Sequence, residues 1–169
     1  MVRVEAVLDT WKTVREDTAV AVEEFPSDDF GFKPALDVMS FGEIATHILN
    51  AGQALTGLLL AGGDNFSTPE FRASLKKYID EIPAHETPTE LAALLRSELA
   101  KRCTALAAQP PEFFSGMITR MDGLQVTRLE MLQYIKEHEL THRSQLFLYL
   151  RLKGLVPATT RRRQAKAKA

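Results

Sequence analysis

Two of the chain's four histidines, His138 and His142, stand four residues apart in the segment 127–152. The hydrophobic pattern predicts that this segment is one long amphipathic helix, and its apolar stripe runs through both histidines. The other members of the stripe are Met131, Ile135, Leu146 and Tyr149. Side chains four positions apart share one face of a helix, with Cβ atoms about 5–6 Å apart, so two imidazoles can bind one metal ion. Because the stripe should face the core, we expect a metal inside the fold and a third ligand from elsewhere in the chain.

A third histidine, His47, lies on the apolar stripe of another predicted helix, 40–60. A single histidine on such a stripe is usually a buried side chain whose ring nitrogens are hydrogen-bonded, and that interpretation suits each of the three taken alone. Burying three unpaired imidazoles would cost several kcal/mol, and one shared metal ion removes that cost. The three together therefore favour a metal site. The fourth histidine, His85, lies in a loop rich in Pro and Thr and is expected to be exposed.

The string HELTH at 138–142 matches the zinc-peptidase motif HExxH, in which Glu139 would be the general base. No Asp or Glu follows Glu139 and no histidine follows His142, so the chain lacks both a downstream carboxylate ligand and the extended form of the motif. A peptidase is therefore disfavoured. Glu139 is rotated by ~100° from His138 and is interpreted as a carboxylate on the helix surface or one that supports the histidines.

The hydrophobic periodicity predicts four long helices, at 2–25, 40–60, 88–109 and 127–152, and a short one at 68–78. Three starts fit the capping box, in which a Ser or Thr precedes a Glu by three residues: Ser40 with Glu43, Thr87 with Glu90, and Thr127 with Glu130. No segment alternates with a period of two, so no sheet is expected. The predicted fold is all-α, a four-helix bundle with an extra short helix and long ordered loops.

Two loops are too apolar to lie free in water. In the first, Phe30 and Phe32 are expected to close one end of the core. In the second, the irregular segment 109–126, Phe113, Phe114 and Met117 are expected to pack over the core.

Length and composition indicate one domain of 169 residues with ordinary hydrophobic content, 45%. Five of the last nine residues are basic, and the rest of the chain carries −6 once these charges are taken from the net −1. An acidic body argues against specific binding of nucleic acid. We expect residues 1–156 to form the bundle and residues 157–169 to form a disordered basic tail.

No apolar run reaches the ~20 residues of a membrane span, the N-terminus is not a signal peptide, and Cys103 has no partner for a disulfide. These features predict a cytoplasmic protein with no membrane association.

Four further side chains have both a structural and a functional interpretation. Trp11 is expected in the core with Arg15 as a partly exposed partner, although Arg15 could also lie at a pocket mouth. Arg143 is expected to form a structural salt bridge, with contact to an anionic substrate as the alternative. Cys103 is expected to be a buried, unreactive thiol.

Residues 2–155 resemble the DinB/YfiT-like family of metalloenzymes, which is unrelated to the DNA polymerase that shares the DinB name. The resemblance rests on Trp11 and Arg15, on Ser40-x-Gly42-Glu43-Ile44-x-x-His47-Ile48, on His138-x-x-x-His142-Arg143-x-Gln145-Leu146, and on Gly154. It implies a four-helix bundle with one metal ion, nickel or zinc being typical and iron or manganese possible, bound by His47, His138 and His142. Many members are homodimers. Ser144 stands where the family often has Gly, which leaves the ligands unaffected because both residues are small.

Some members of this family transfer low-molecular-weight thiols to electrophiles or isomerise maleylpyruvate with a thiol cofactor. The leading hypothesis is therefore a metal-dependent enzyme that activates a water or a small thiol, for hydrolysis or thiol transfer, on a small-molecule substrate. The alternative is a non-catalytic, metal-stabilised bundle that binds a small ligand or a protein partner. The sequence shows no recognisable residues of a thiol-binding pocket and does not identify the substrate.

Overall fold

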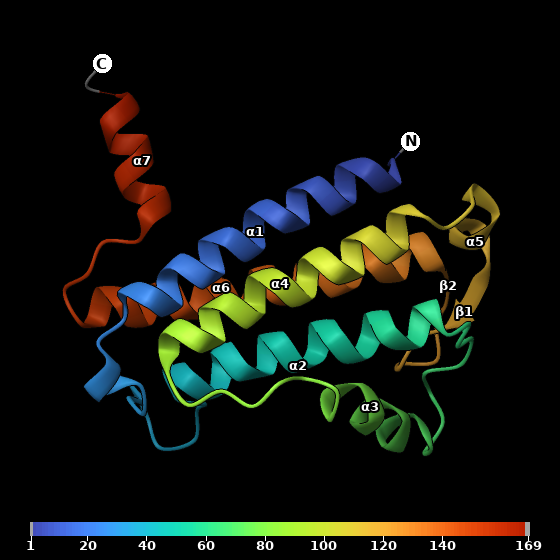
Figure 1. The fold of residues 1–169 in the computed structure, drawn as a ribbon, viewed down its shortest axis with the longest axis horizontal. Coiled ribbons are helices and arrows are strands. Elements are labelled where there is room, and N and C mark those ends of the chain that lie inside the picture. The colour runs from blue at the N-terminus through green and yellow to red at the C-terminus, as the bar shows by residue number, and fades with distance from the viewer. Residues whose placement is uncertain (1, 168–169) are drawn as a thin grey trace.

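The computed structural model describes residues 2–167, and four long helices make up most of it, two running in one direction and two in the other (Figure 1). These helices are α1 (Val4–Glu24), α2 (Phe41–Leu60), α4 (Pro88–Ala107) and α6 (Arg128–Leu152). Helices α1 and α2 each pack against both α4 and α6 and scarcely touch each other, so they lie on one diagonal of the bundle. The prediction of an all-α four-helix bundle is confirmed.

The helix ends follow the local signals of the sequence. Helices α2, α4 and α6 begin with complete capping boxes, in which the Ser or Thr hydroxyl accepts from the backbone of the Glu, and the Glu carboxylate accepts from the capping residue. Helix α6 ends at Leu152 and is followed by Gly154, whose φ of +76° lies in the left-handed region that glycine adopts without strain. The backbone N–H of Leu155 then donates to the carbonyl of Leu150 at 2.9 Å, which satisfies one free carbonyl of the last turn.

The interior of the bundle contains two apolar clusters, one toward each end. The first includes Phe25, Phe41, Ile44, Leu95 and Leu146, and the second includes Trp11, Leu55, Leu99, Met131 and Ile135. Burying each large apolar side chain contributes about 1.5–3 kcal/mol relative to its exposure. Along α1 and α6, the buried polar side chains Arg15, Thr18 and Glu139 lie between the two clusters. The middle of the bundle is therefore polar, and its two ends supply the hydrophobic stabilisation.

Short elements lie outside the four long helices. They are the 3₁₀ turn η1 (Ser27–Asp29), α3 (Phe71–Ile79), α5 (Pro111–Ser115), β1 (Met117–Thr119) and β2 (Gln125–Thr127). Helix α3 lies beside α2 (Figure 1) and begins later than predicted, at Phe71, with no side-chain cap from Glu70. The expectation of no sheet was wrong, since β1 and β2 form a small antiparallel pair in which Ile118 faces Val126. Strands of three residues are too short to show an alternating pattern in the sequence.

The two apolar loops largely pack as expected. Phe30 and Phe32 lie partly buried against the first cluster, which confirms that they close this end of the core. Phe114 is buried and Phe113 packs against the second cluster. Met117, in contrast, is 54% exposed, so its expected place over the core was wrong. It lies at the start of β1, where side chains alternate between the two faces and the neighbouring Ile118 is the one that is buried.

The C-terminal segment differs from its prediction. Residues Ala158–Lys166 form helix α7, which points away from the bundle (Figure 1), so disorder was the wrong expectation for this stretch. Arg161 pairs with Glu24 and Arg162 pairs with Asp17, both of which belong to α1. Composition alone does not reveal that these arginines meet acidic partners far away in the sequence. Residues 168 and 169 of the predicted tail lie outside the described residues.

Among the helices of residues 2–167, none has the length and apolar character of a membrane span.

Candidate metal centre

Three of the four histidines converge at one point between α2 and α6. The Nε2 atoms of His47 and His138 lie 3.1 Å apart, and those of His142 and His138 lie 3.2 Å apart. One ring nitrogen from each of the three can be chosen so that all lie within 4.8 Å of one another. Two nitrogens bound to one tetrahedral zinc ion at ~2.05 Å would be about 3.3 Å apart. The sequence-predicted ligands are therefore brought together at a spacing that fits one ion.

The ionisation of these histidines also suits a metal. Burial lowers the pKa of His47, and the neighbouring His142 lowers it further. Burial, with smaller contributions from His142 and His47, lowers the pKa of His138 to about 4. Neutral imidazole is the form that binds metal, so a lowered pKa keeps the rings of His47 and His138 ready to bind at neutral pH. Three imidazole nitrogens form a donor set that suits Zn, Ni, Cu and Fe ions.

Gln145 orients one of the three rings. Nδ1 of His142 lies 2.8 Å from Oε1 of Gln145, one helical turn further along α6. An amide oxygen can only accept, so this contact places the proton on Nδ1 and leaves the Nε2 lone pair directed at the other histidines. Residues that hold the second ring nitrogen of a metal-binding histidine fix its orientation. Gln145 was part of the sequence motif, but no role could be assigned to it without the structure.

The histidines are not sealed in the core, as the position of their stripe had suggested, and two of them line an open pocket. All three are half-buried. His47 and His138 form part of the wall of a pocket of about 370 Å³, which also includes Phe71, Leu75 and Ile79 from α3. Small-molecule sites are typically of this size and mostly apolar, with a few converging polar groups. The cluster is therefore accessible to a ligand from one side.

Glu139 turns away from the histidines and is held by helix α1. Its carboxylate accepts from Nε and Nη2 of Arg15 at 2.7 and 2.8 Å, from Nε1 of Trp11, and from the hydroxyl of Thr18 at 3.2 Å. These four bonds occupy about all the lone-pair positions of a carboxylate. Its side chain is 3% exposed and that of Arg15 is 4% exposed, so the expectations of a partly exposed Arg15 and of a helix-surface Glu139 were both wrong.

Arg15 is further fixed by the backbone of α4. Its Nη1 donates to the carbonyl of Leu95 at 2.8 Å, so one guanidinium links α1, α4 and α6. The position of Trp11 in the core is confirmed. Arg15 was part of the family resemblance and Glu139 was part of the HExxH string, but the two are 124 residues apart, and no local signal indicates that they pair.

Arg143, next to His142, forms the expected structural ion pair. Its Nη1 lies 3.2 Å from Oδ2 of Asp17, a buried carboxylate that also pairs with Arg162 of α7. The guanidinium of Arg143 also lies 5.0 Å from the ring centroid of Phe147. Arg143 does not line the pocket beside the histidines.

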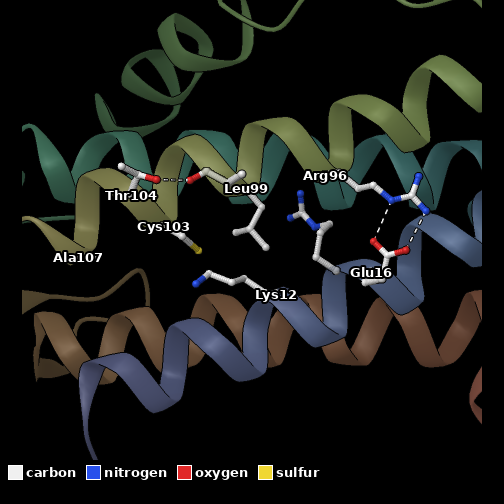
Figure 2. A pocket seen from close by; sticks show the side chains of 9 residues that line it. Lys12, Glu16, Arg96, Leu99, Cys103, Thr104 and Ala107 are labelled. Atoms are coloured by element: carbon white, nitrogen blue, oxygen red, sulfur yellow. Dashed lines mark hydrogen bonds and ion pairs between the residues drawn. The ribbon is translucent and has the colours of Figure 1, made fainter.

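A larger groove lies between α1 and α4, away from the histidines (Figure 2). Its volume is about 510 Å³, and charged side chains along it include Lys12, Glu16 and Arg96. Cys103 borders this groove but is 3% exposed, and burial raises the pKa of its thiol. This agrees with the prediction of an unreactive thiol, since the thiolate is the reactive form. Arg96 forms ion pairs with Glu16 and Glu23, so the charges of Arg96 and Glu16 in this groove are already paired.

His85 does not join the histidine cluster. It is partly exposed, which is more buried than predicted, and it lies beside Phe30 and Gly42 at a separate small pocket. Within residues 2–167, His47, His138 and His142 form the one group of potential ligands close enough to share an ion.

Comparison with known proteins places this architecture among its relatives. A sequence model described as the DinB family matches residues 1–168. The Bacillus subtilis protein YjoA is 27% identical over 143 residues, which cover 83% of this chain and 84% of YjoA. The crystal structure of YjoA, described as a DinB-like protein, has a TM-score of 0.68 at 25% identity and covers 88% of this chain and 92% of that one.

Two further solved structures share the fold at lower identity. A protein from Exiguobacterium sibiricum described under the DinB family has a TM-score of 0.64 at 21% identity, with 91% of this chain and 94% of that chain covered. A mycothiol-dependent maleylpyruvate isomerase has a TM-score of 0.62 at 15% identity, with 86% of this chain and 61% of that chain covered. At these identities the likeness shows the fold alone.

The Glu139 environment predicts that the protein is not a peptidase of the HExxH type. A general base must reach a water beside the metal, whereas this carboxylate faces α1 and its hydrogen bonds are occupied. Purified protein loaded with zinc is expected to release no fluorescent peptides from labelled casein. Cleavage that stops on chelation and is lost in Glu139→Gln would contradict this reading.

The same environment predicts a large stability loss on removal of the carboxylate. Glu139→Gln leaves the buried guanidinium of Arg15 without a counter-charge, so the free energy of unfolding should fall by roughly 3–5 kcal/mol, measured by urea denaturation. Glu137→Gln, two residues away on the exposed face of α6, is the matched control and should change it by less than about 0.5 kcal/mol. The double variant Arg15→Met with Glu139→Leu should recover most of the loss. A small effect of Glu139→Gln would mean that the ion pair is not a main support of the bundle.

Proposed function

The chain belongs to the DinB family, and we propose that it is a metal-dependent enzyme in which His47, His138 and His142 hold one divalent transition-metal ion. The observation that carries this proposal is the convergence of three ring nitrogens at 3.1 and 3.2 Å, a spacing that fits one ion. Nickel and zinc are the leading candidates, followed by iron and manganese. Imidazole ligands suit nickel, zinc and iron well, and manganese less well.

The ion, Gln145 and the apolar wall would each have a separate role in such a site. When bound, the ion supplies a positive charge that lowers the pKa of a water or thiol and so makes a nucleophile available at neutral pH. Gln145 holds the His142 ring with its Nε2 lone pair facing inward. The apolar wall beside His47 and His138 gives an electrophilic small molecule a place to bind next to the nucleophile. Hydrolysis and thiol transfer both fit this arrangement.

A small thiol is the proposed co-substrate for the transfer reaction. The support is the shared fold with an isomerase whose description names mycothiol as its requirement. We further propose that the protein acts as a homodimer in the cytoplasm, a setting in which an unpaired, buried Cys103 stays reduced.

A second candidate function follows from the position of the ligands on different helices. His47 belongs to α2 and the other two belong to α6, so a bound ion would tie two helices of the bundle together. A non-catalytic, metal-stabilised bundle that binds a small ligand or a protein partner would use the ion in this way. Catalytic turnover separates the two candidates.

The first test is metal content. Wild-type protein dialysed after purification should retain close to one divalent transition-metal ion per chain, measured by plasma mass spectrometry. His47→Ala, His138→Ala and His142→Ala should each lose most of the metal, whereas the control His85→Ala should retain it. Equal retention in all four variants would refute the three-histidine site. The loaded protein is then assayed against thiols and electrophiles, and turnover that disappears on chelation identifies an enzyme.

The second test is the effect of pH on metal-dependent stability. An ion that binds only the folded state raises stability by about 4 kcal/mol at a thousandfold excess over Kd. Protons compete with it only when the ligands titrate, and the pKa of His138 in the folded protein is lowered to about 4 while that of His47 is also lowered. The stabilisation should therefore be present at pH 7.5 and be lost as the pH falls toward 4. Thermal melts with and without chelator measure it, and an absent difference at pH 7.5 would show that the metal is not coupled to folding.

A further inference from the structure

We propose that the pocket beside the three histidines selects an uncharged small-molecule substrate with an apolar portion, in preference to one that carries free carboxylates. This inference rests on the proposed function, because it names the substrate class of that same metal site. Three features carry it: the apolar lining of the pocket, the neutral polar groups next to the histidines, and the absence of Lys and Arg from the described lining.

The lining of the pocket is apolar apart from groups that flank the histidines. Helix α3 contributes Phe71, Leu75 and Ile79, which follow one another at intervals of four residues and so form one stripe of that helix. Met121, from the loop between β1 and β2, adds a thioether. No Asp, Glu, Lys or Arg of the described chain lines this pocket, so its charge would come from the metal alone.

The polar groups of the pocket other than the histidines are uncharged. Asn50 follows His47 by three residues on α2, and Tyr134 precedes His138 by four residues on α6, so each lies about one helical turn from a proposed ligand. An amide and a phenol can hydrogen-bond a carbonyl, ester or hydroxyl group without needing an opposite charge. Their position fixes the polar part of the substrate near the metal and its apolar part toward α3.

The cation beside Tyr134 is already paired. The guanidinium of Arg120 lies 5.1 Å from the ring centroid of Tyr134, but it is bound to the carboxylate of Asp122 and does not line the pocket. A carboxylate buried against Phe71 or Leu75 would therefore lose its hydration without gaining a partner, which is costly. One carboxylate could reach the metal, but a dicarboxylate such as maleylpyruvate would leave its second charge unpaired. The pocket thus argues against that substrate for this chain.

The test compares two metal-binding probes that differ in one charge. The probes are 1-benzylimidazole and 4-(imidazol-1-ylmethyl)benzoate, which share the imidazole that binds the metal and the aromatic ring that would lie against α3. Isothermal titration calorimetry on zinc-loaded protein at pH 7.5 gives both Kd values without relying on activity. The neutral probe is expected to bind at least ~10-fold more tightly than the carboxylated one, because the carboxylate must be desolvated without a partner.

Two methionines of the same hairpin provide matched variants. Met121 lines the pocket and is 37% exposed, whereas Met117 is 54% exposed and lies outside the pocket lining, so both positions can accept Lys without disturbing the core. Met121→Lys is expected to tighten binding of the carboxylated probe by roughly 5–10-fold, as a partly desolvated charge pair does. Met117→Lys should leave both Kd values within about twofold, since an exposed charge outside the pocket is screened.

The outcomes separate this inference from the function on which it rests. Equal affinities for the two probes in wild-type protein, or tighter binding of the carboxylated one, would overturn the substrate class while leaving the metal site intact. Binding of neither probe to protein that retains zinc would also overturn it. Failure of the wild-type protein to retain any metal ion would instead refute the proposed function, and the substrate class with it.

Discussion

The buried ion pair between Glu139 and Arg15 fixes the rotation of helix α6, and the candidate site depends on that rotation. Successive residues of an α-helix turn by ~100°, so Glu139 and the neighbouring His138 cannot face the same helix. With Glu139 bound to α1, His138 and His142 face α2, where His47 meets them. A rotation of α6 by one residue would bury a histidine against Arg15 and separate the three ring nitrogens. Glu139, which resembled a peptidase base, therefore has a structural role: it holds α6 in the rotation that directs His138 and His142 toward α2.

Placing this polar centre in the middle of the bundle has a consequence for stability. The two apolar clusters lie on either side of it, so the helices are held at both ends by hydrophobic burial. A buried ion pair contributes little net stability, but the loss of one partner is strongly destabilising. The arrangement therefore favours one register of α1, α4 and α6 over the alternatives. This specificity is what a metal site built from two helices requires, since its ligands must be held to within a fraction of an ångström.

The elements outside the bundle shape the pocket. The four long helices bring the histidines together. Helix α3 and the hairpin loop then supply the apolar wall of the pocket beside His47 and His138. Loops and short elements carried on a rigid scaffold commonly determine what a site binds. In this chain they carry Phe71, Leu75, Ile79 and Met121, and none of these was recognisable as a pocket residue from the sequence. The ligands and the substrate wall therefore come from different parts of the architecture.

Local patterns in the sequence determined the helices and the candidate ligands. The three capping boxes, the glycine that ends α6 and the four-residue spacing of His138 and His142 are each contained within a few residues, so the sequence shows them directly. Tertiary structure decided the rest. The contact of His47 with His138 joins residues 91 positions apart, and the pairing of Arg15 with Glu139 joins residues 124 apart. The ion pairs of helix α7 with Asp17 and Glu24 likewise join opposite ends of the chain. Helix periodicity shows which side chains share a face, but only the packing of the helices decides which face meets which, and that packing sets burial, ion pairing and the shape of the pocket.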